Sequence, residues 1–444
     1  MNWKNNKLFL FLASVYWVLF CIMFSRASFM AGVIFSLGIS FVYIFLPLEK
    51  EWLFVLSALP FMAMFKVSPS LPSTSVFLYM IFIFKGYTEG YRLKKQYFIR
   101  LLLLFGIQFF LLLFLGRSFV PLISLLVNLL FMTVATEIII SRSETGTKTF
   151  LTITSVYSVS VALMSLMSRI FPNIASLVSN VDHSFMLDGA LKSRYSGIAG
   201  DPNYYTQLIT IAIALSVSAF LVCHASRIHK IMLTFLSLYL VYCGVLTYSK
   251  SFYLTLSILA LLVLWYIYRL GIAAKKTFVI LMAAAPVLII GFYYFVIKFV
   301  LPGVLQRVTS TVDFSSGRFE IWSTYFEMLA NNPFVIMLGA GIENARYLIA
   351  PYYGKVQAAH NAFIELFADT GIIGCFLLGG MYKKNILAGI RFVGNPISLF
   401  FLIFIVTSMS LSFSAYDTIC FVIPLLPLFS LKNSGEAYNL NLEG

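Results

Sequence analysis

The sequence is poor in charged residues. Only 11% of its 444 residues are Asp, Glu, Lys or Arg, while 60% are hydrophobic. An ordinary soluble domain has about 25% charged residues, so this shortage excludes a soluble globular protein and indicates a chain that crosses a membrane many times. Acidic residues are the rarer kind, with 17 Asp and Glu against 31 Lys and Arg. The basic residues lie mostly in short loops between apolar runs, a pattern that sets membrane orientation and argues against nucleic-acid binding.

Cysteine and histidine are also scarce, with five and four residues respectively. The cysteines lie inside apolar segments without the paired spacing of a disulfide framework or a zinc site. We interpret them as small core residues and expect neither a metal nor a cofactor. Ionisable residues are nearly missing from the middle of the apolar runs, which argues against an ion-coupled carrier. No linker, charge run or internal repeat divides the chain, so we expect one integral membrane domain over residues 1–444.

Apolar runs of the length that crosses a bilayer, about twenty residues, recur along the chain. They predict an all-α fold, a polytopic helical bundle of about 12 to 14 transmembrane helices, of which the third and fourth are short. The candidate spans lie near residues 8–24, 27–46, 52–65, 73–84, 98–115, 119–140, 149–171, 203–223, 231–248, 252–268, 277–300, 361–381, 396–412 and 418–431. Lys and Arg in the short loops predict cytoplasmic termini, with the two long polar loops, 172–202 and 301–360, facing outward together.

The first outward loop delivers one arginine to the predicted outer membrane surface. Arg194 precedes Asp201-Pro202-Asn203, a strong turn or helix-start signal at the head of the next span. Tyr195 follows the arginine directly. The loop is a candidate binding site. The alternative is that the arginine is an interfacial anchor and the tyrosine belongs to the aromatic belt that flanks membrane spans.

The second outward loop contains a predicted amphipathic helix that begins near Arg318, with Ser315 and Ser316 as candidate N-caps. Its aromatic side is predicted to face lipid or the bundle, and Asn331-Asn332-Pro333 ends it. The predicted aromatic side comprises Phe319, Trp322, Phe326 and Leu329, and the predicted polar side comprises Glu320, Ser323, Thr324 and Glu327. The helix dipole disfavours a cation in the first turn, so helix stability does not explain Arg318, whereas a bound anion would.

The same loop continues with glycines and then with aromatic and polar side chains. Gly339 and Gly341 permit a close backbone approach. Arg346, Tyr352 and Tyr353 follow. A sugar-binding cleft uses this mixture, because rings stack on pyranose faces while polar groups bond hydroxyls. Any outer loop near lipid headgroups has a similar composition, so both interpretations stay open.

A histidine stands where the second loop is predicted to re-enter the membrane. His360 and Asn361 are followed by nine residues and then by Gly371 and Gly374. With an ordinary pKa near 6.5, a neutral imidazole at this boundary is a suitable general base for activating a hydroxyl. The alternative is that the histidine only forms hydrogen bonds within its loop and that the glycines allow helices to pack closely.

Taken together, these motifs resemble the O-antigen ligase and Wzy-type polymerase superfamily of bacterial membrane glycosyltransferases. The resemblance rests on His360-Asn361-x9-Gly371-x2-Gly374, on Gly317-Arg318 with Trp322, Asn332-Pro333, Gly339 and Gly341, and on Arg194-x2-Gly197 with Asp201-Pro202-Asn203. It implies a GT-C-like fold with an outer cavity, in the bacterial cytoplasmic (inner) membrane. It also implies a donor glycan on undecaprenyl diphosphate, transferred to an acceptor hydroxyl with inversion and without a metal.

The resemblance further implies roles for particular residues. Arg194 and Arg318 would hold the diphosphate, and His360 would deprotonate the acceptor hydroxyl. Arg346, with Asn361, Tyr195, Tyr352 and Tyr353, would contact the diphosphate or the glycan. Some polymerases of the superfamily carry Arg-x10-Gly segments in both outer loops, and no arginine here has glycine at that spacing. Lys192, Arg307 and Arg346 are therefore alternative diphosphate ligands.

The leading functional hypothesis is a polymerase that joins lipid-linked repeat units into an O-antigen, capsule or exopolysaccharide chain. A ligase that moves a finished chain to lipid A core or another acceptor is the alternative within the same chemistry. A polysaccharide flippase is a third hypothesis from a different class. The expected partners are the undecaprenyl-diphosphate-linked donor and acceptor and the lipid bilayer, with a chain-length regulator as a further candidate.

Overall fold

The computed structural model describes residues 3–26, 38, 43–65, 75–142, 146–174, 184–187, 190–223, 225–269, 317–391 and 396–411. The predicted spans at 277–300 and 418–431, and most of the span at 27–46, lie outside these residues. So do Arg307, Ser315, Ser316 and Cys420.

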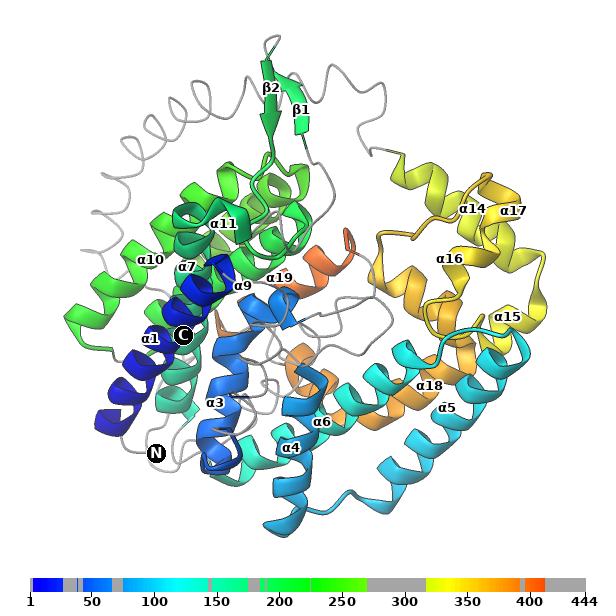
Figure 1. Ribbon diagram of the computed structural model, residues 1–444, viewed down its shortest axis with the longest axis horizontal. Helices are drawn as coiled ribbons and strands as arrows, with labels where there is room; N and C mark the ends of the chain where they lie inside the picture. Colours follow the sequence, from blue (N-terminus) through cyan, green and yellow to red (C-terminus); the bar gives the residue numbers. More distant parts are fainter. Residues whose placement is uncertain are drawn as a thin grey trace.

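The described residues are helical almost throughout (Figure 1). The N-terminal helices are α1 (Trp3–Arg26), α3 (Leu48–Ala58), the 3-10 helix η1 (Leu59–Phe65), α4 (Ser75–Thr88), α5 (Lys95–Phe114), α6 (Val120–Arg142) and α7 (Gly146–Ile170). Then come α9 (Pro202–Val222), α10 (Arg227–Val245), α11 (Lys250–Arg269), α14 (Arg318–Ala330), α15 (Pro333–Leu338), α16 (Ala345–Leu348), α17 (Ala350–Tyr353), α18 (Ala362–Arg391), η3 (Pro396–Ser398) and α19 (Leu399–Ser408).

Seven of the described helices are long and apolar enough to cross a membrane: α5, α6, α7, α9, α10, α11 and α18. They confirm the prediction of an all-α, polytopic membrane protein. The third and fourth predicted spans correspond to shorter helices, α3 with η1 and then α4. The free cysteines Cys21, Cys223 and Cys243 are buried, as the interpretation of cysteines as core residues requires.

Helix α9 is the central element of one group of helices and packs against α7, α10, α11 and α19. Small polar side chains let these helices approach closely, since Ser158 Oγ of α7 lies 3.0 Å from Ser216 Oγ of α9. The amide of Gln207 in α9 donates to Thr407 Oγ1 of α19 at 3.1 Å. A second group contains α4, α5, α6 and α18, in which α5 packs on both α6 and α18.

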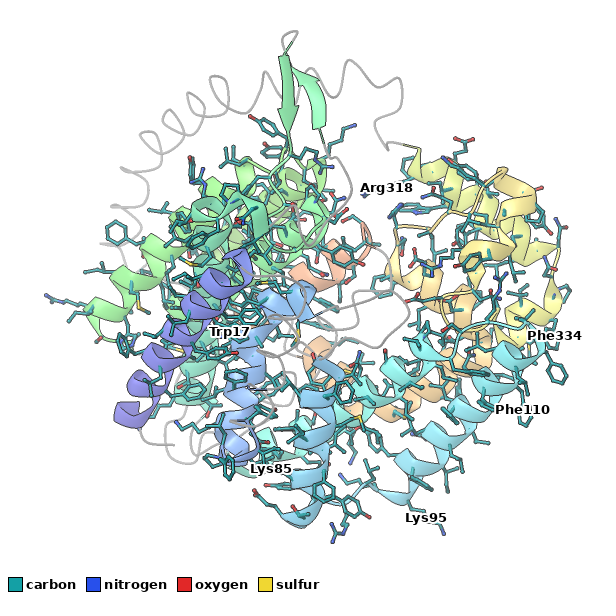
Figure 2. All side chains as sticks on the ribbon, viewed as in Figure 1. Trp17, Lys85, Lys95, Phe110, Arg318 and Phe334 are labelled. Atoms are coloured by element: carbon teal, nitrogen blue, oxygen red, sulfur yellow. The ribbon has the colours of Figure 1, made fainter. Side chains whose placement is uncertain are left out.

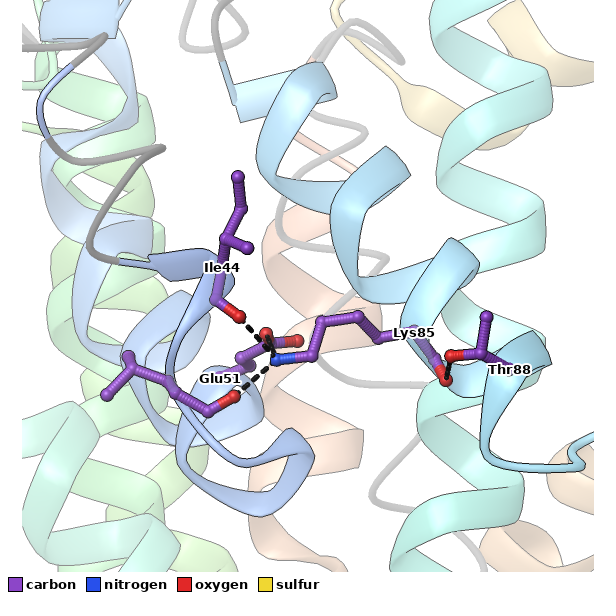
Figure 3. Close-up of polar contacts among 5 residues, drawn as sticks. Ile44, Glu51, Lys85 and Thr88 are labelled. Carbon is purple, nitrogen blue, oxygen red and sulfur yellow. Dashed lines mark hydrogen bonds and ion pairs between the residues drawn. The ribbon is translucent and has the colours of Figure 1, made fainter.

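A buried ion pair links the two short helices α3 and α4. Lys85 near the end of α4 reaches the Glu51 carboxylate at the start of α3 and also donates to the carbonyls of Leu46 and, at 3.0 Å, Ile44 (Figure 3). The Glu51 side chain is fully buried, with 0% exposure, whereas Lys85 keeps 21%. The ammonium therefore pairs with a carboxylate that water does not reach and also binds the two carbonyls.

Two short strands interrupt the helical fold within the first predicted outward loop. Strand β1 (Ser184–Leu187) pairs antiparallel with β2 (Ala190–Ser193), with Ser184 opposite Ser193. The hairpin ends directly before Arg194, and the chain then enters α9 eight residues later.

Residues 317–391 form a lobe beside α5, drawn in yellow and orange in Figure 1. Its helices enclose a small hydrophobic core of their own, centred on Tyr325, Met328 and Ile349. The predicted faces of α14 are partly wrong. Phe319 and Phe326 are exposed, and Thr324 is buried with Ile321, Tyr325, Met328 and Leu329. Packing into this core, rather than the position of the aromatic residues, decides which side of the helix faces inward.

Candidate functional site

Two side chains of α14 hold the loop that carries His360. The Trp322 indole donates from Nε1 to the Ala359 carbonyl at 2.8 Å, and the Tyr325 hydroxyl donates to the Gln357 carbonyl at 2.9 Å. Both carbonyls belong to the segment 357–360, which lies outside the helices. The helix that starts at Arg318 therefore fixes the position of His360.

His360 itself adopts a left-handed backbone conformation, with φ +51°. Its backbone N–H donates to Glu365 Oε1 at 2.9 Å, one turn into α18. On the ring, Nε2 lies 3.0 Å from the amide nitrogen of Gln357. An amide N–H donated there leaves the lone pair on Nε2 and the ring proton on Nδ1, so Gln357 favours one tautomer of the neutral imidazole.

Asn361 is the N-cap of α18. Its side-chain oxygen accepts from the N–H groups of Phe363 at 3.1 Å and Ile364 at 3.3 Å. The side chain is buried and used by the helix end, whose first N–H groups have no partners within the helix. The sequence contains the signal for this arrangement, an asparagine directly before an apolar helix.

The signature glycine Gly371 marks a break within α18. Its φ of +65° and ψ of −175° are non-helical. At the break, the Ala340 and Gly341 N–H groups donate to the carbonyls of Ala368 and Asp369 at 2.8 and 3.0 Å. A Cβ on Gly339 would lie 2.2 Å from the Asp369 carbonyl oxygen. The backbones of the loop and of α18 therefore meet only because residues 339 and 371 are both glycine. The predicted close approach is therefore found, and it docks the loop after α15 onto α18.

The Asp369 carboxylate completes this junction. It accepts from the backbone N–H groups of Glu343 at 2.9 Å and Ala345 at 3.0 Å, just before and within α16. The side chain is buried. It accepts the hydrogen bonds that water would otherwise accept from two N–H groups at the start of a short helix. Its role in the structure is therefore to order the loop.

Arg194 is held by the turn between α10 and α11. Its Nε donates to the Thr247 carbonyl at 3.1 Å, and one terminal nitrogen lies 3.5 Å from Asn203 Oδ1. The same Asn203 oxygen accepts from the Ser249 hydroxyl at 2.9 Å. Tyr248, in the middle of the turn, has φ +48°. Two segments of the chain, this turn and the start of α9, therefore fix the position of the guanidinium.

Asp201, the N-cap of α9, interacts with residues of the second loop as well as with its own helix. Its Oδ1 caps α9 by accepting from Asn203 N–H at 2.6 Å and Tyr204 N–H at 3.2 Å. The same carboxylate interacts electrostatically with Arg318 and with His360, and this interaction partly opposes the lowering of their pKa values by burial. The first turn of α9 thus contacts Arg194 through Asn203 and faces the other loop through Asp201.

Arg318 is the first residue of α14 and lies on the side of that lobe nearest the α9 group (Figure 2). The N-cap is Gly317, with φ +80° and no side-chain cap bond, so the helix begins at Arg318 within the predicted start segment. Burial lowers the pKa of the Arg318 guanidinium, against the effect of Asp201. Burial and the charge of Arg318 also lower the pKa of His360. The imidazole is accordingly neutral near pH 7, beside a permanently charged guanidinium.

The other predicted site residues are engaged within the fold. The Tyr195 hydroxyl donates to the Ser165 carbonyl of α7 at 2.6 Å, and Arg346 pairs with Glu343 at 3.1 Å. Tyr352 accepts from the Asn332 amide at 3.1 Å, and the Lys355 ammonium lies 5.5 Å from the Tyr353 ring centroid. The structure describes no direct contact between these side chains and His360. Within the described residues, His, Cys, Asp and Glu side chains form no group of three that could hold a metal ion.

Sequence reasoning missed four residues that shape the site: Gln357, Asp201, Asn203 and Ser249. Asp201 and Asn203 were recognised only as a helix-start signal, which they also are. The spacing of three residues between Gln357 and His360 was the only local indication for Gln357. Nothing local pointed to Ser249, which is 46 residues from its partner Asn203.

Comparison with known families adds independent information. Residues 235–379 match the family model described as O-Antigen ligase, a range that contains both Arg318 and His360. The comparison with curated proteins gave no match. The matched range begins within α10 and ends within α18, so it includes the turn that holds Arg194, although Arg194 itself precedes it. The described helices and this match make the chain a multi-pass membrane protein with a segment that is similar to the O-Antigen ligase family.

Proposed function

We propose that this protein is a polysaccharide polymerase that joins undecaprenyl-diphosphate-linked repeat units into O-antigen, capsule or exopolysaccharide chains. The observation that supports the proposal is the electrostatic interaction of Asp201, at the start of α9, with two residues of the second loop. There Asp201 interacts with both Arg318 and His360, while Asn203 contacts Arg194. A glycosyl transfer from a lipid diphosphate needs these chemical groups at one place.

The two arginines bind the diphosphate of the donor in this proposal. Guanidinium groups pair with phosphate oxygens in bidentate fashion, and each charge-assisted hydrogen bond contributes about 1.5 to 3 kcal/mol. Arg318 is partly desolvated, which strengthens its interaction with an anion. As the bond between the anomeric carbon and the diphosphate breaks, negative charge grows on the leaving group, and both guanidinium groups stabilise it.

His360 is the general base. The acceptor hydroxyl oxygen forms the new bond to the anomeric carbon, and its proton passes to the lone pair of the neutral imidazole. The undecaprenyl diphosphate departs from the opposite side, so the configuration at the carbon inverts. The Asp201 carboxylate stabilises the resulting imidazolium. Gln357 holds the ring before the substrate displaces it from Nε2.

The remaining parts of the proposal concern the setting of the site. The chain acts as one domain in the bacterial inner membrane, with cytoplasmic termini and the site facing outward. Arg346, Tyr352 and Tyr353 contact the glycan along the lobe after α15, where the two tyrosines are partly exposed. Tyr195 and Asn361 support the site indirectly, because the Tyr195 hydroxyl binds α7 and the Asn361 side chain caps the start of α18.

Reconstitution tests the function directly. The purified protein is supplied with undecaprenyl diphosphate repeat units, with and without a lipid A core acceptor. A ladder of products without the acceptor is expected for the polymerase. Product that appears only with the acceptor would replace it with the ligase.

A matched pair of histidine variants separates catalysis from transport. His360→Ala should lower the rate by about 100-fold to 10,000-fold, the usual contribution of general acid–base catalysis. His229→Ala is the control, because His229 lies at the start of α10, where its Nδ1 is 3.0 Å from the Ser226 hydroxyl. Full-length polysaccharide at normal levels in His360→Ala cells would rule out the catalytic proposal and favour a flippase.

A further inference from the structure

The structure places irregular backbone of the second loop beside two membrane spans, inside the ends of both. The Leu338 carbonyl at the end of α15 accepts from the Gln108 amide of α5 at 3.5 Å. Gln108 is fully buried and belongs to the buried stripe of α5 with Leu101, Leu104 and Leu112. A glutamine inside a hydrophobic span needs a partner, and here the partner is a helix end that the loop supplies.

The contacts between α5 and α18 give the depth of this segment. The Arg100 guanidinium donates to the Gly380 carbonyl, and a Cβ on Gly374 would lie 3.5 Å from Leu104. The two spans therefore run antiparallel in register, and the next turn of α5 after Leu104 carries Gln108. Gly339 meets α18 at Asp369 on the same level.

Two independent spans then give the same distance from the membrane surface. Gln108 lies six residues before the end of α5 at Phe114, and Asp369 lies seven residues after the start of α18 at Ala362. At 1.5 Å per residue, both lie about 10 Å inside the ends of their helices. The 20 residues of α5 are about 30 Å long, the thickness of the hydrocarbon core.

We propose that residues 333–341, α15 with the turn that follows it, form a re-entrant element that enters the bilayer about 10 Å deep, with its outer face against lipid acyl chains. Irregular backbone tolerates this depth only where protein covers it. Gly339, Ala340 and Gly341 are all buried, and α18 and Gln108 satisfy their neighbouring polar groups.

The outer face of the element is apolar and continues a surface that faces lipid. Phe334 is 62% exposed and Met337 48%. They are three residues apart, so they lie on the same side of α15. Phe334 and Phe110 of α5 lie on the same outer edge of the molecule (Figure 2). Phe110 belongs to the exposed side of a membrane span, so the lipid that covers α5 covers α15 as well.

This depth has a consequence for the site, which rests on the proposed function. His360 precedes the first residue of α18 by two positions, so it lies at the level of the lipid headgroups. The diphosphate of a lipid-linked donor lies at the same level. An anchored α15 would keep α14 and its Arg318 at that height while the glycan extends away from the membrane.

Site-directed spin labelling measures the depth in the full-length protein in liposomes. Labels at Phe334→Cys and Met337→Cys are compared with a label at Phe110→Cys as the lipid reference and at Lys355→Cys, an exposed turn residue, as the water reference. The signal of the labelled parent protein is subtracted as background, since three of its native cysteines are buried.

The expected result is a ratio of oxygen to nickel-complex accessibility at both α15 positions that equals the Phe110 reference and is several-fold above the Lys355 reference. A ratio at either α15 position equal to that of Lys355 would overturn the proposal. The two labels are separate variants, so one that fails to fold leaves the other to decide. The measurement needs no catalysis, and a failed polymerase assay would leave its outcome unchanged.

Discussion

Replacing Gly371 by alanine is the sharpest test of how the second loop is assembled. The residue has φ +65° and ψ −175°, a region that side chains other than glycine rarely enter. A Cβ there would lie 2.5 Å from the Gly339 nitrogen and 2.6 Å from the carbonyl oxygen of Met337. Both contacts involve backbone atoms, so no side-chain rotation can relieve them. The loop after α15 has to move away from α18.

The cost follows from two contributions. The strained backbone conformation costs about 1 to 3 kcal/mol. Insertion of a methyl group into a packed contact costs about 1 to 3 kcal/mol more, because the neighbours have to shift. The expected destabilisation is therefore about 2 to 6 kcal/mol, a large fraction of the 5 to 15 kcal/mol that stabilises a typical native protein. The hydrogen bonds of Ala340 and Gly341 to α18 would be lost with it.

Thermal unfolding in detergent and polymerisation in liposomes measure the effect, with Gly379→Ala as the matched control. Gly379 lies in the same helix, and a Cβ there meets no atom within 4 Å. Alanine should be neutral at that position or stabilise the helix by up to about 1 kcal/mol. A Gly371→Ala protein that unfolds at the temperature of the control would refute the proposed docking. Gly339→Ala should reproduce the Gly371 result, because it enters the same contact from the other side.

Three further predictions concern protonation, capping and the ion pair. Because burial and Arg318 lower the pKa of His360, its basic form persists below pH 6.5, and kcat/KM should fall only below that pH. Asp201→Asn should move this acid limb to still lower pH, since it removes a carboxylate that raises the pKa. Asn361→Ala should lower the free energy of unfolding by about 1 kcal/mol through loss of the α18 cap. Lys85→Met should cost about 3 to 5 kcal/mol, because it leaves the Glu51 carboxylate buried without its partner.

Each of these has its own control. An acid limb above pH 6.5, or one that rises in Asp201→Asn, would contradict the electrostatic description of His360. Asn361→Asp retains the capping oxygen and should keep the melting temperature of the parent; equal losses for Ala and Asp would contradict the capping role. Lys94→Met is the control for Lys85, because its pair with Glu137 is 65% and 37% exposed, and such pairs contribute at most about 1 kcal/mol.

The elements were easier to predict than their faces. The span predicted at 203–223 is α9 at Pro202–Val222, because an apolar run bounded by Asp-Pro satisfies its own backbone hydrogen bonds wherever it packs. The prediction for α14 found the helix and its end at Ala330 but not its inward side. A helix of 13 residues with aromatic residues on two sides can face its core in more than one way. Burial of its Tyr325 in the core that also contains Ile349 decides between them.

The sequence by itself determined the helical membrane fold, the polar loops and the histidine motif, because each depends on composition and spacing over a few turns of chain. Only the tertiary structure decided which residues meet. Asp201 faces Arg318 and His360 across more than a hundred residues of sequence, and Ser249 supports Arg194 through Asn203. It also decided that Gly339 and Gly371 form one contact at the depth of Gln108. Local sequence patterns do not predict such pairings. They arise because α18 breaks at Gly371 and accepts hydrogen bonds from the loop that follows α15.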